Sequence, residues 1–111
     1  MSESKYKFAT KAIHAGQPPE SVTGAVIPPI FQTSTFAQAS PGEDKGYDYS
    51  RAQNPTRKVL EDCLASLENA KYCTAYSSGV AATHNLINAL EAGSHIICGD
   101  DVYGGTYRLF T

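Results

Sequence analysis

Several features that would place this chain of 111 residues in a familiar class of protein are missing. Its nine Lys and Arg residues form no cluster, so the concentrated basic face of a nucleic-acid-binding protein is not predicted. No apolar run approaches the roughly 20 residues that a membrane-spanning helix requires. The first residues, MSESKYKFATKAIHAG, contain no apolar signal core, and the acidic Glu3 weighs against a transit peptide. These absences predict a protein that binds neither nucleic acid nor membrane.

Cysteine is scarce, and its spacing excludes the usual cysteine-based sites. Cys63, Cys73 and Cys98 are odd in number, and no CxxC motif or Cys/His pair has metal-ligand spacing. We therefore expect reduced thiols in the core of a cytoplasmic protein and no metal site. The sequence also lacks GxGxxG and GxxxxGK[ST], so dinucleotide and P-loop sites are not predicted.

The composition that remains is globular. Hydrophobic residues make up 41% and charged residues 18%, and the formal net charge is -2. Residues 1–6 are expected to form a loose tail, and the proline-containing segment from 17 to 36 is expected to be extended, because proline lacks an amide donor. We predict an extended N-terminal arm over 1–53, which has little to pack against locally and is expected to lie on another domain or to contact a neighbouring subunit. The start of an α/β domain is predicted over 54–111.

Helix signals occur at two places before residue 70. KFATKAIHAG predicts a short helix that stops at Gly16. Asn54 as N-cap and Pro55 at the first helical position predict a second helix. Apolar residues then recur with helical period on one side of that helix, at Val59, Leu60, Cys63, Leu64 and Leu67. Pairs of opposite charge four residues apart, Arg57 with Glu61 and Lys58 with Asp62, are expected on its solvated side.

A strand, a helix and a second strand are predicted next. KYCTAY (71–76) and SHIIC (94–98) have strand character, and the segment between them predicts a helix that ends near Gly93. This pattern indicates a βαβ unit with parallel strands. A parallel sheet is covered on both faces, and the sequence offers too few helices for that cover. We therefore expect this chain to be the first part of a longer α/β enzyme.

Three short stretches contain residues suited to an anionic ligand. Ser-Ser-Gly at 77–79 begins a helix after a strand, where free amides and the positive end of the helix dipole suit a phosphate. Tyr49 and Arg51 are two apart in an irregular segment, so both side chains can donate to the same phosphate. Tyr103 lies in a glycine-flanked loop after the second predicted strand, where α/β sheets bind ligands. Taken singly, each stretch has a plainer explanation: an ordinary N-cap, a surface Arg beside a packed Tyr, and a loop aromatic.

Together, YDYSRAQNPTR, SSGVAAT and DDVYGGTYRLF resemble the Cys/Met-metabolism family of pyridoxal-phosphate (PLP) enzymes, which includes cystathionine γ-lyases and γ-synthases. FATKAIHAGQ and GAVIPPIFQTSTF are similar to that family's N-terminal arm, so the resemblance covers nearly the whole chain. It implies fold type I, the aspartate-aminotransferase-like fold, of which this chain would hold the arm and the first βαβ part. It also implies a homotetramer built from dimers with shared active sites.

The resemblance assigns roles to particular residues. The backbone amides of Gly79 and Val80 would bind the cofactor phosphate, and Tyr49 and Arg51 would reach the same phosphate from the neighbouring subunit. Tyr103 would stack on the pyridine ring and take part in proton transfer, which makes it the catalytic candidate. Arg108 falls where lyase members carry an Arg close to the substrate.

The resemblance also implies chemistry that this chain lacks. In the family, a downstream lysine forms a Schiff base with the cofactor. None of the six lysines here matches it, including Lys11, whose ATK setting aligns with the arm. The 111-residue chain is therefore expected to be inactive by itself.

For the whole enzyme we expect a carbon–sulfur lyase activity in trans-sulfuration: γ-elimination of L-cystathionine to cysteine, 2-oxobutyrate and ammonia. One alternative is γ-replacement, in which cysteine displaces the acyl group of an O-acyl homoserine. The other is a non-catalytic fragment, if the chain ends at Thr111.

Overall fold

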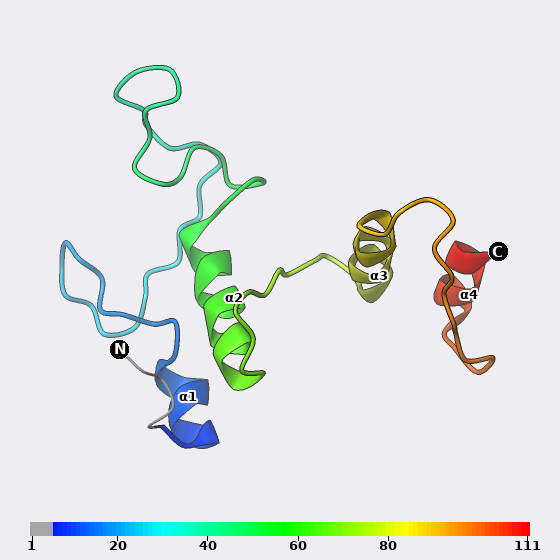
Figure 1. Cartoon of the computed structure of the whole chain (residues 1–111). Helices are drawn as coiled ribbons and strands as arrows, with labels where there is room; N and C mark the ends of the chain where they lie inside the picture. Colours follow the sequence, from blue (N-terminus) through cyan, green and yellow to red (C-terminus); the bar gives the residue numbers. More distant parts are fainter. Residues whose placement is uncertain (1–5) are drawn as a thin grey trace. The chain divides into compact units, whose positions relative to one another are not determined.

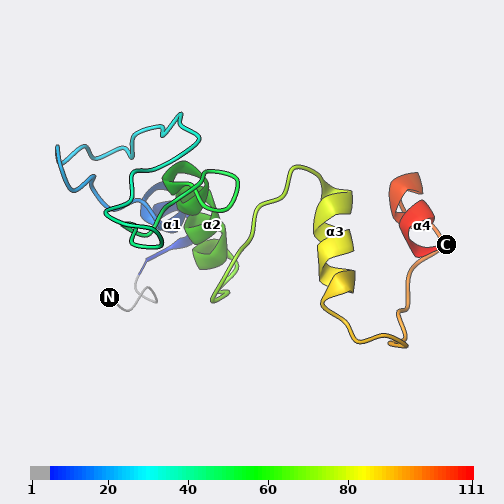
Figure 2. The same cartoon turned by 90° about the horizontal axis from the view of Figure 1, so that it is seen from above.

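The computed structural model describes residues 6–111, which form two compact units that divide between Thr74 and Ala75. Residues 1–5, where most of the expected tail lies, are outside the described residues. The elements are all helices, and Figure 1 and Figure 2 label them in chain order. They are α1 (Phe8–His14), α2 (Pro55–Leu67), α3 (Gly79–Asn88) and α4 (Gly104–Phe110). No helix among the described residues is long and apolar enough to cross a membrane.

In the first unit, α1 packs against α2, and both views show the two helices side by side (Figures 1 and 2). Gly16 ends α1 with a φ of 70°, as the sequence predicts. A Cβ built on Gly16 would lie 2.6 Å from the Cβ of Asp62 and 2.8 Å from the amide nitrogen of Cys63. Glycine is therefore required here twice, for the left-handed turn and for the close approach of the chain to α2.

Lys11 connects the same two helices at the C-terminal end of α2. Its Nζ donates to the carbonyl oxygen of Ser66 at 3.2 Å and to Oδ1 of Asn69 at 3.1 Å. Asn69 adopts a φ of 52°, and the amide of Ala70 donates to the carbonyl of Ala65 at 2.8 Å, which closes the helix end. A cation at this end of a helix also interacts favourably with the helix dipole.

The start of α2 forms as the sequence predicts. Asn54 is the N-cap, its side chain accepts a hydrogen bond from the amide of Thr56 at 2.8 Å, and Pro55 is the first helical residue. The ion pairs Arg57–Glu61 and Lys58–Asp62 also form, at 3.6 Å and 2.5 Å.

The predicted apolar side of α2 is covered less than expected. Leu60 remains 50% exposed and Leu64 40% exposed, while the buried residues of the helix are Ala65 and Ser66. Ala65 and Ser66 lie near the C-terminal end of α2, where Lys11 of α1 donates to the carbonyl of Ser66. The cysteines are likewise not in a core as predicted: Cys63 and Cys73 are half-buried and Cys98 is exposed, all three as free thiols.

The two predicted strands are a further correction. Neither 71–76 nor 94–98 forms a strand, and within residues 6–111 the extended pairing is limited to two antiparallel bridges, Thr35–Tyr49 and Ser40–Glu43. A two-stranded parallel sheet has little stability of its own and needs cover on both faces, which the described helices do not supply. The helix between the predicted strands does form, but it ends at Asn88 rather than near Gly93.

Candidate cofactor site

Tyr49 and Arg51 lie together in the turn that precedes α2. Nη2 of Arg51 donates to the hydroxyl of Tyr49 at 2.7 Å, and the guanidinium carbon lies 5.0 Å from the centre of the Tyr49 ring. Tyr49 is half-buried and Arg51 is exposed. The prediction that both side chains point to one side is therefore confirmed, and a polar group formed by the phenol and the guanidinium faces solvent.

The arm positions this pair through a short antiparallel contact. Thr35 bridges to Tyr49, the amide of Phe36 donates to the carbonyl of Asp48 at 2.8 Å, and the amide of Ser50 donates to the carbonyl of Ser34 at 2.8 Å. Alternation along this extended contact fixes the face on which the Tyr49 side chain lies.

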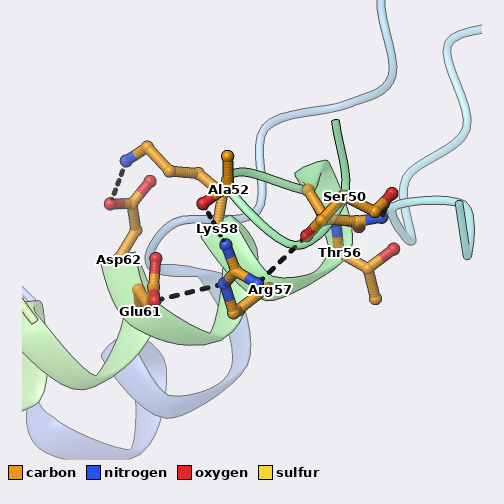
Figure 3. A network of polar contacts seen from close by, with 8 residues as sticks. Ser50, Ala52, Thr56, Arg57, Lys58, Glu61 and Asp62 are labelled. Carbon is orange, nitrogen blue, oxygen red and sulfur yellow. Dashed lines mark hydrogen bonds and ion pairs between the residues drawn. The ribbon is translucent and has the colours of Figure 1, made fainter. Parts of the chain in front are cut away.

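Arg57 holds the same turn from the side of α2 (Figure 3). Its Nη1 donates to the carbonyl of Ser50 at 3.2 Å and its Nη2 to the carbonyl of Ala52 at 2.5 Å, while Nε pairs with Glu61. The sequence assigned Arg57 only a surface ion pair, so this role was missed. The sequence did contain a signal for this role. Arg57 follows Arg51 by six residues and lies in the first turn of a helix, so its side chain lies beside the preceding loop.

In the second unit, α3 begins with two uncovered amides. Ser78 is the N-cap, and its hydroxyl accepts a hydrogen bond from the amide of Ala81 at 3.1 Å. The amides of Gly79 and Val80, one residue and two residues into the helix, donate to no acceptor within residues 6–111. A Cβ built on Gly79 would meet nothing within 4 Å, so the space at this helix start is open.

Tyr103 lies against the same helix start. A Cβ built on Gly105 would lie 2.5 Å from Cε1 of Tyr103 and 3.1 Å from Cγ2 of Val80, so the Tyr103 ring and Val80 meet over Gly105. Contacts between α3 and α4 support this arrangement. Tyr103 is nevertheless 73% exposed, which leaves most of its ring free for contact with a ligand.

The remaining predicted residue, Arg108, lies in the last turn of α4. It is exposed and makes no hydrogen bond or ion pair with the described part of the chain. A cation is favoured near the C-terminal end of a helix, which suits Arg108. No contact within residues 6–111 orients the Arg108 side chain toward a ligand.

Two ionisable groups of the described chain have displaced pKa values, and neither belongs to these clusters. The side-chain hydrogen bond to Asp62 raises the pKa of Lys58 above its ordinary value. The amides of Val22 and Thr23 hold the pKa of Glu20 below its ordinary value, because they donate to its carboxylate at 2.9 and 2.7 Å. Both shifts arise from local pairing on the surface.

The structure thus forms two clusters from the predicted residues. Tyr49 and Arg51 make one in the first unit, and Gly79, Val80 and Tyr103 make the other in the second. One presents a phenol and a guanidinium, and the other presents free amides beside an aromatic ring. Donors of these kinds beside an exposed aromatic ring are typical of proteins that bind a phosphorylated aromatic cofactor.

The comparisons identify the family within that class. The sequence profile of the family described as "Cys/Met metabolism PLP-dependent enzyme" matches residues 9–111. The chain belongs to this family, whose cofactor is pyridoxal phosphate.

Relatives with several trans-sulfuration names are similar to this chain. It is 64% identical over 105 residues to the "Probable cystathionine gamma-synthase" of Herpetosiphon aurantiacus, covering 95% of this chain and 33% of the relative. It is 56% identical to human "Cystathionine gamma-lyase" over 104 residues, 93% of this chain and 26% of the relative. The "Cystathionine beta-lyase" of Coxiella burnetii is 50% identical over 109 residues, which are 98% of this chain and 28% of the relative. The chain thus spans between about a quarter and a third of these relatives.

Solved structures show the same fold. The structure of metB from Corynebacterium glutamicum matches 99% of this chain and 29% of its own, with a TM-score of 0.88 and 46% identity. Cystathionine gamma-lyase from yeast matches 96% of this chain and 27% of its own, with a TM-score of 0.84 and 52% identity. The chain therefore has the fold of the PLP-dependent cystathionine enzymes over the part that it spans, although the predicted strands are not formed.

The residues present fit the cofactor. The open space and the two free amides at the start of α3 suit a phosphate, and the exposed Tyr103 ring beside Val80 suits a flat aromatic ring next to that phosphate. The guanidinium of Arg51 supplies a planar donor for phosphate oxygens.

Proposed function

We propose that this chain is part of a PLP-dependent enzyme of sulfur amino-acid metabolism that cleaves L-cystathionine by γ-elimination to cysteine, 2-oxobutyrate and ammonia. The observation that carries the cofactor part of this proposal is the cluster of Gly79, Val80 and Tyr103, which combines free helix amides with an exposed aromatic ring. The family match and the identity to cystathionine enzymes support a PLP-dependent reaction of trans-sulfuration, and the similarity to gamma-lyases is consistent with γ-elimination.

Each residue of the proposed site has a distinct task. The amides of Gly79 and Val80 hold the phosphate at the positive end of α3. Arg51 and Tyr49 donate to the same phosphate from the neighbouring subunit, the guanidinium as a bidentate fork. Tyr103 covers one face of the ring, keeps water from that face, and moves a proton through its hydroxyl. Arg108 contributes to the binding of the substrate carboxylate.

When bound, the cofactor acts as an electron sink and stabilises negative charge on the substrate carbons. The cofactor-binding lysine would lie in a part of the enzyme other than the 111 residues, because none of the six lysines here matches that residue of the family, and Lys11 already donates to Ser66 and Asn69 at the C-terminal end of α2. We therefore propose that the 111-residue chain is inactive alone, and that the arm over 1–53 contacts a neighbouring subunit in a tetramer built from dimers. We also propose that the enzyme acts in the cytoplasm.

A second candidate is γ-replacement, in which cysteine displaces the acyl group of an O-acyl homoserine. The 64% identity to a relative named as a gamma-synthase favours it, because this exceeds the 56% identity to the human gamma-lyase. Both reactions remove a substituent from the γ carbon, so the same site serves either one.

Product analysis of the full-length enzyme tests this proposal. With cystathionine as the sole substrate, we expect 2-oxobutyrate and cysteine in equal amounts, measured by chromatography. Faster consumption of an O-acyl homoserine when cysteine is added, with cystathionine as the product, would instead assign γ-replacement. Pyruvate and homocysteine from cystathionine would contradict both assignments, because they come from cleavage at the β carbon.

A further inference from the structure

Arg57 uses its guanidinium donors within the protein rather than toward a ligand (Figure 3). Nη1 donates to the carbonyl oxygen of Ser50 at 3.2 Å, and Nη2 donates to that of Ala52 at 2.5 Å. Nε lies 3.6 Å from Oε1 of Glu61, one helical turn along α2. The side chain of Arg57 is 33% exposed: its contact with the Ser50 carbonyl is partly buried, and its contact with the Ala52 carbonyl is exposed.

The two carbonyls that Arg57 binds belong to the residues on either side of Arg51. The same turn is closed by the amides of Ala52 and Gln53, which donate to the carbonyl of Tyr49 at 3.0 and 2.8 Å. The backbone of Arg51 is therefore fixed on both sides, while its side chain remains exposed and contacts Tyr49. Without the fork of Arg57, the carbonyls of Ser50 and Ala52 would lose their hydrogen bonds to α2, and the side-chain contact of Ser50 with the N-cap Asn54 at 2.9 Å would remain.

We propose that Arg57 is a positioning residue, which fixes the turn carrying Tyr49 and Arg51 so that the Arg51 guanidinium is already placed for a phosphate. This inference rests on the proposed role of Arg51 in holding the cofactor phosphate. Its physical basis is preorganisation, because a donor that is fixed before binding loses less conformational freedom when the ligand arrives.

The geometry requires arginine at residue 57 rather than any cation. Two carbonyls on either side of Arg51 are bound by two different nitrogens of one planar group, which the single ammonium of lysine cannot reproduce. Arg57→Lys should therefore retain the charge and part of the contact, and Arg57→Gln should lose both.

Lys58 provides the matched control. It is the next residue of the same helix, carries the same charge, and also pairs with a carboxylate four residues on, Asp62. In contrast to Arg57, it donates to no carbonyl of the 50–52 turn. Lys58→Gln therefore reproduces the loss of charge and of one ion pair without loosening the turn.

The test uses the full-length enzyme and measures the dissociation constant of pyridoxal phosphate. We expect Arg57→Gln to raise the dissociation constant about threefold to tenfold, Arg57→Lys to raise it less, and Lys58→Gln to change it by less than about twofold. In an Arg51→Ala background, Arg57→Gln should add less than about twofold, because its effect passes through Arg51. Thermal unfolding of the apoenzyme is measured for each variant to check that it folds. If Arg57→Gln does not fold, Arg57→Lys replaces it in the comparison with the Arg51→Ala background.

An equal effect of Arg57→Gln and Lys58→Gln would overturn the inference, as would an undiminished effect of Arg57→Gln in the Arg51→Ala background. An unchanged dissociation constant in Arg51→Ala alone would overturn both this inference and the role of Arg51. The reaction itself is tested separately, because the products of cystathionine cleavage do not depend on the residue that positions Arg51.

Discussion

At the scale of single residues, the two adjacent glycines of the YGGT stretch have different surroundings. A Cβ on Gly105 would lie 2.5 Å from Cε1 of Tyr103, whereas a Cβ on Gly104 would meet nothing within 4 Å. Both residues belong to the first turn of α4, and neither has a positive φ. Gly105 is therefore a glycine because the Tyr103 ring occupies the space where its side chain would be.

Gly105→Ala in the full-length enzyme should displace the Tyr103 ring. If that ring stacks on the cofactor, the dissociation constant of pyridoxal phosphate should rise about threefold to tenfold, the range that aromatic stacking contributes. Gly104→Ala should leave it unchanged and stabilise α4 slightly, because alanine favours a helix over glycine. Titration with the cofactor, followed by visible absorbance, gives the dissociation constants of the two variants. Circular dichroism measures the stability of the helix.

The dependence on the ring is checked in a Tyr103→Ala background. There Gly105→Ala should have no further effect on cofactor affinity, since the ring that it displaces is absent. Equal affinities of the Gly105→Ala and Gly104→Ala enzymes would show that the position of the Tyr103 ring does not matter for the cofactor.

At the scale of elements, the contact between α1 and α2 depends on Gly16. This residue combines a φ of 70° with a close approach to α2, since a Cβ on it would lie only 2.6 Å from the Cβ of Asp62. Gly24 has a similar φ of 72°, but a Cβ there would meet nothing within 4 Å. A comparison of substitutions at Gly16 and Gly24 therefore separates the cost of backbone strain from the cost of losing the close approach to α2.

Gly16→Ala should destabilise the full-length protein more than Gly24→Ala. Both substitutions place a Cβ in the left-handed region, which costs about 1–2 kcal/mol. Gly16→Ala must also move α1 away from α2, which adds about 1–3 kcal/mol, the usual cost of overpacking. Urea unfolding followed by circular dichroism gives both free energies of unfolding. If the two variants lose similar amounts of unfolding free energy, the close contact between Gly16 and α2 contributes nothing to stability.

At the scale of the whole molecule, the site that we propose would be shared between subunits. Arg51 would serve the phosphate of a neighbouring subunit, whereas Gly79, Val80 and Tyr103 would serve their own. A hybrid of an Arg51→Ala subunit with a subunit that lacks the Schiff-base lysine would then contain one complete site.

Such hybrids should be more active than either of the two variant enzymes alone. Random pairing of equal amounts of the two variants should restore about a quarter of the parent activity, because half of the dimers are hybrids and each has one intact site. The assay measures 2-oxobutyrate at limiting pyridoxal phosphate, where loss of Arg51 is most severe. Activity no greater than that of the Arg51→Ala enzyme would place the whole site in one subunit.

Local sequence determined the features of this protein that depend on neighbouring residues. Asn54 and Pro55 begin α2, Gly16 ends α1, and Ser78 caps α3, because a cap or a turn is decided by the conformation of a few adjacent residues. The approach of Tyr49 to Arg51 was also predicted, but from the geometry of an extended segment, whereas residues 50–52 form a turn that brings the two side chains together.

Contacts across long separations were decided by the tertiary structure alone. Ala65 and Ser66 are buried while Leu60 and Leu64 of the predicted apolar side stay exposed, because the part of α2 that α1 and its Lys11 cover is set by contacts between residues more than 50 positions apart. Strands at 71–76 and 94–98 were predicted from residue type, but a strand exists only when a partner accepts its hydrogen bonds and a layer covers it. Arg57 is the clearest case: its charge and position predicted an ion pair with Glu61, and only the folded turn brings the carbonyls of Ser50 and Ala52 to its remaining nitrogens.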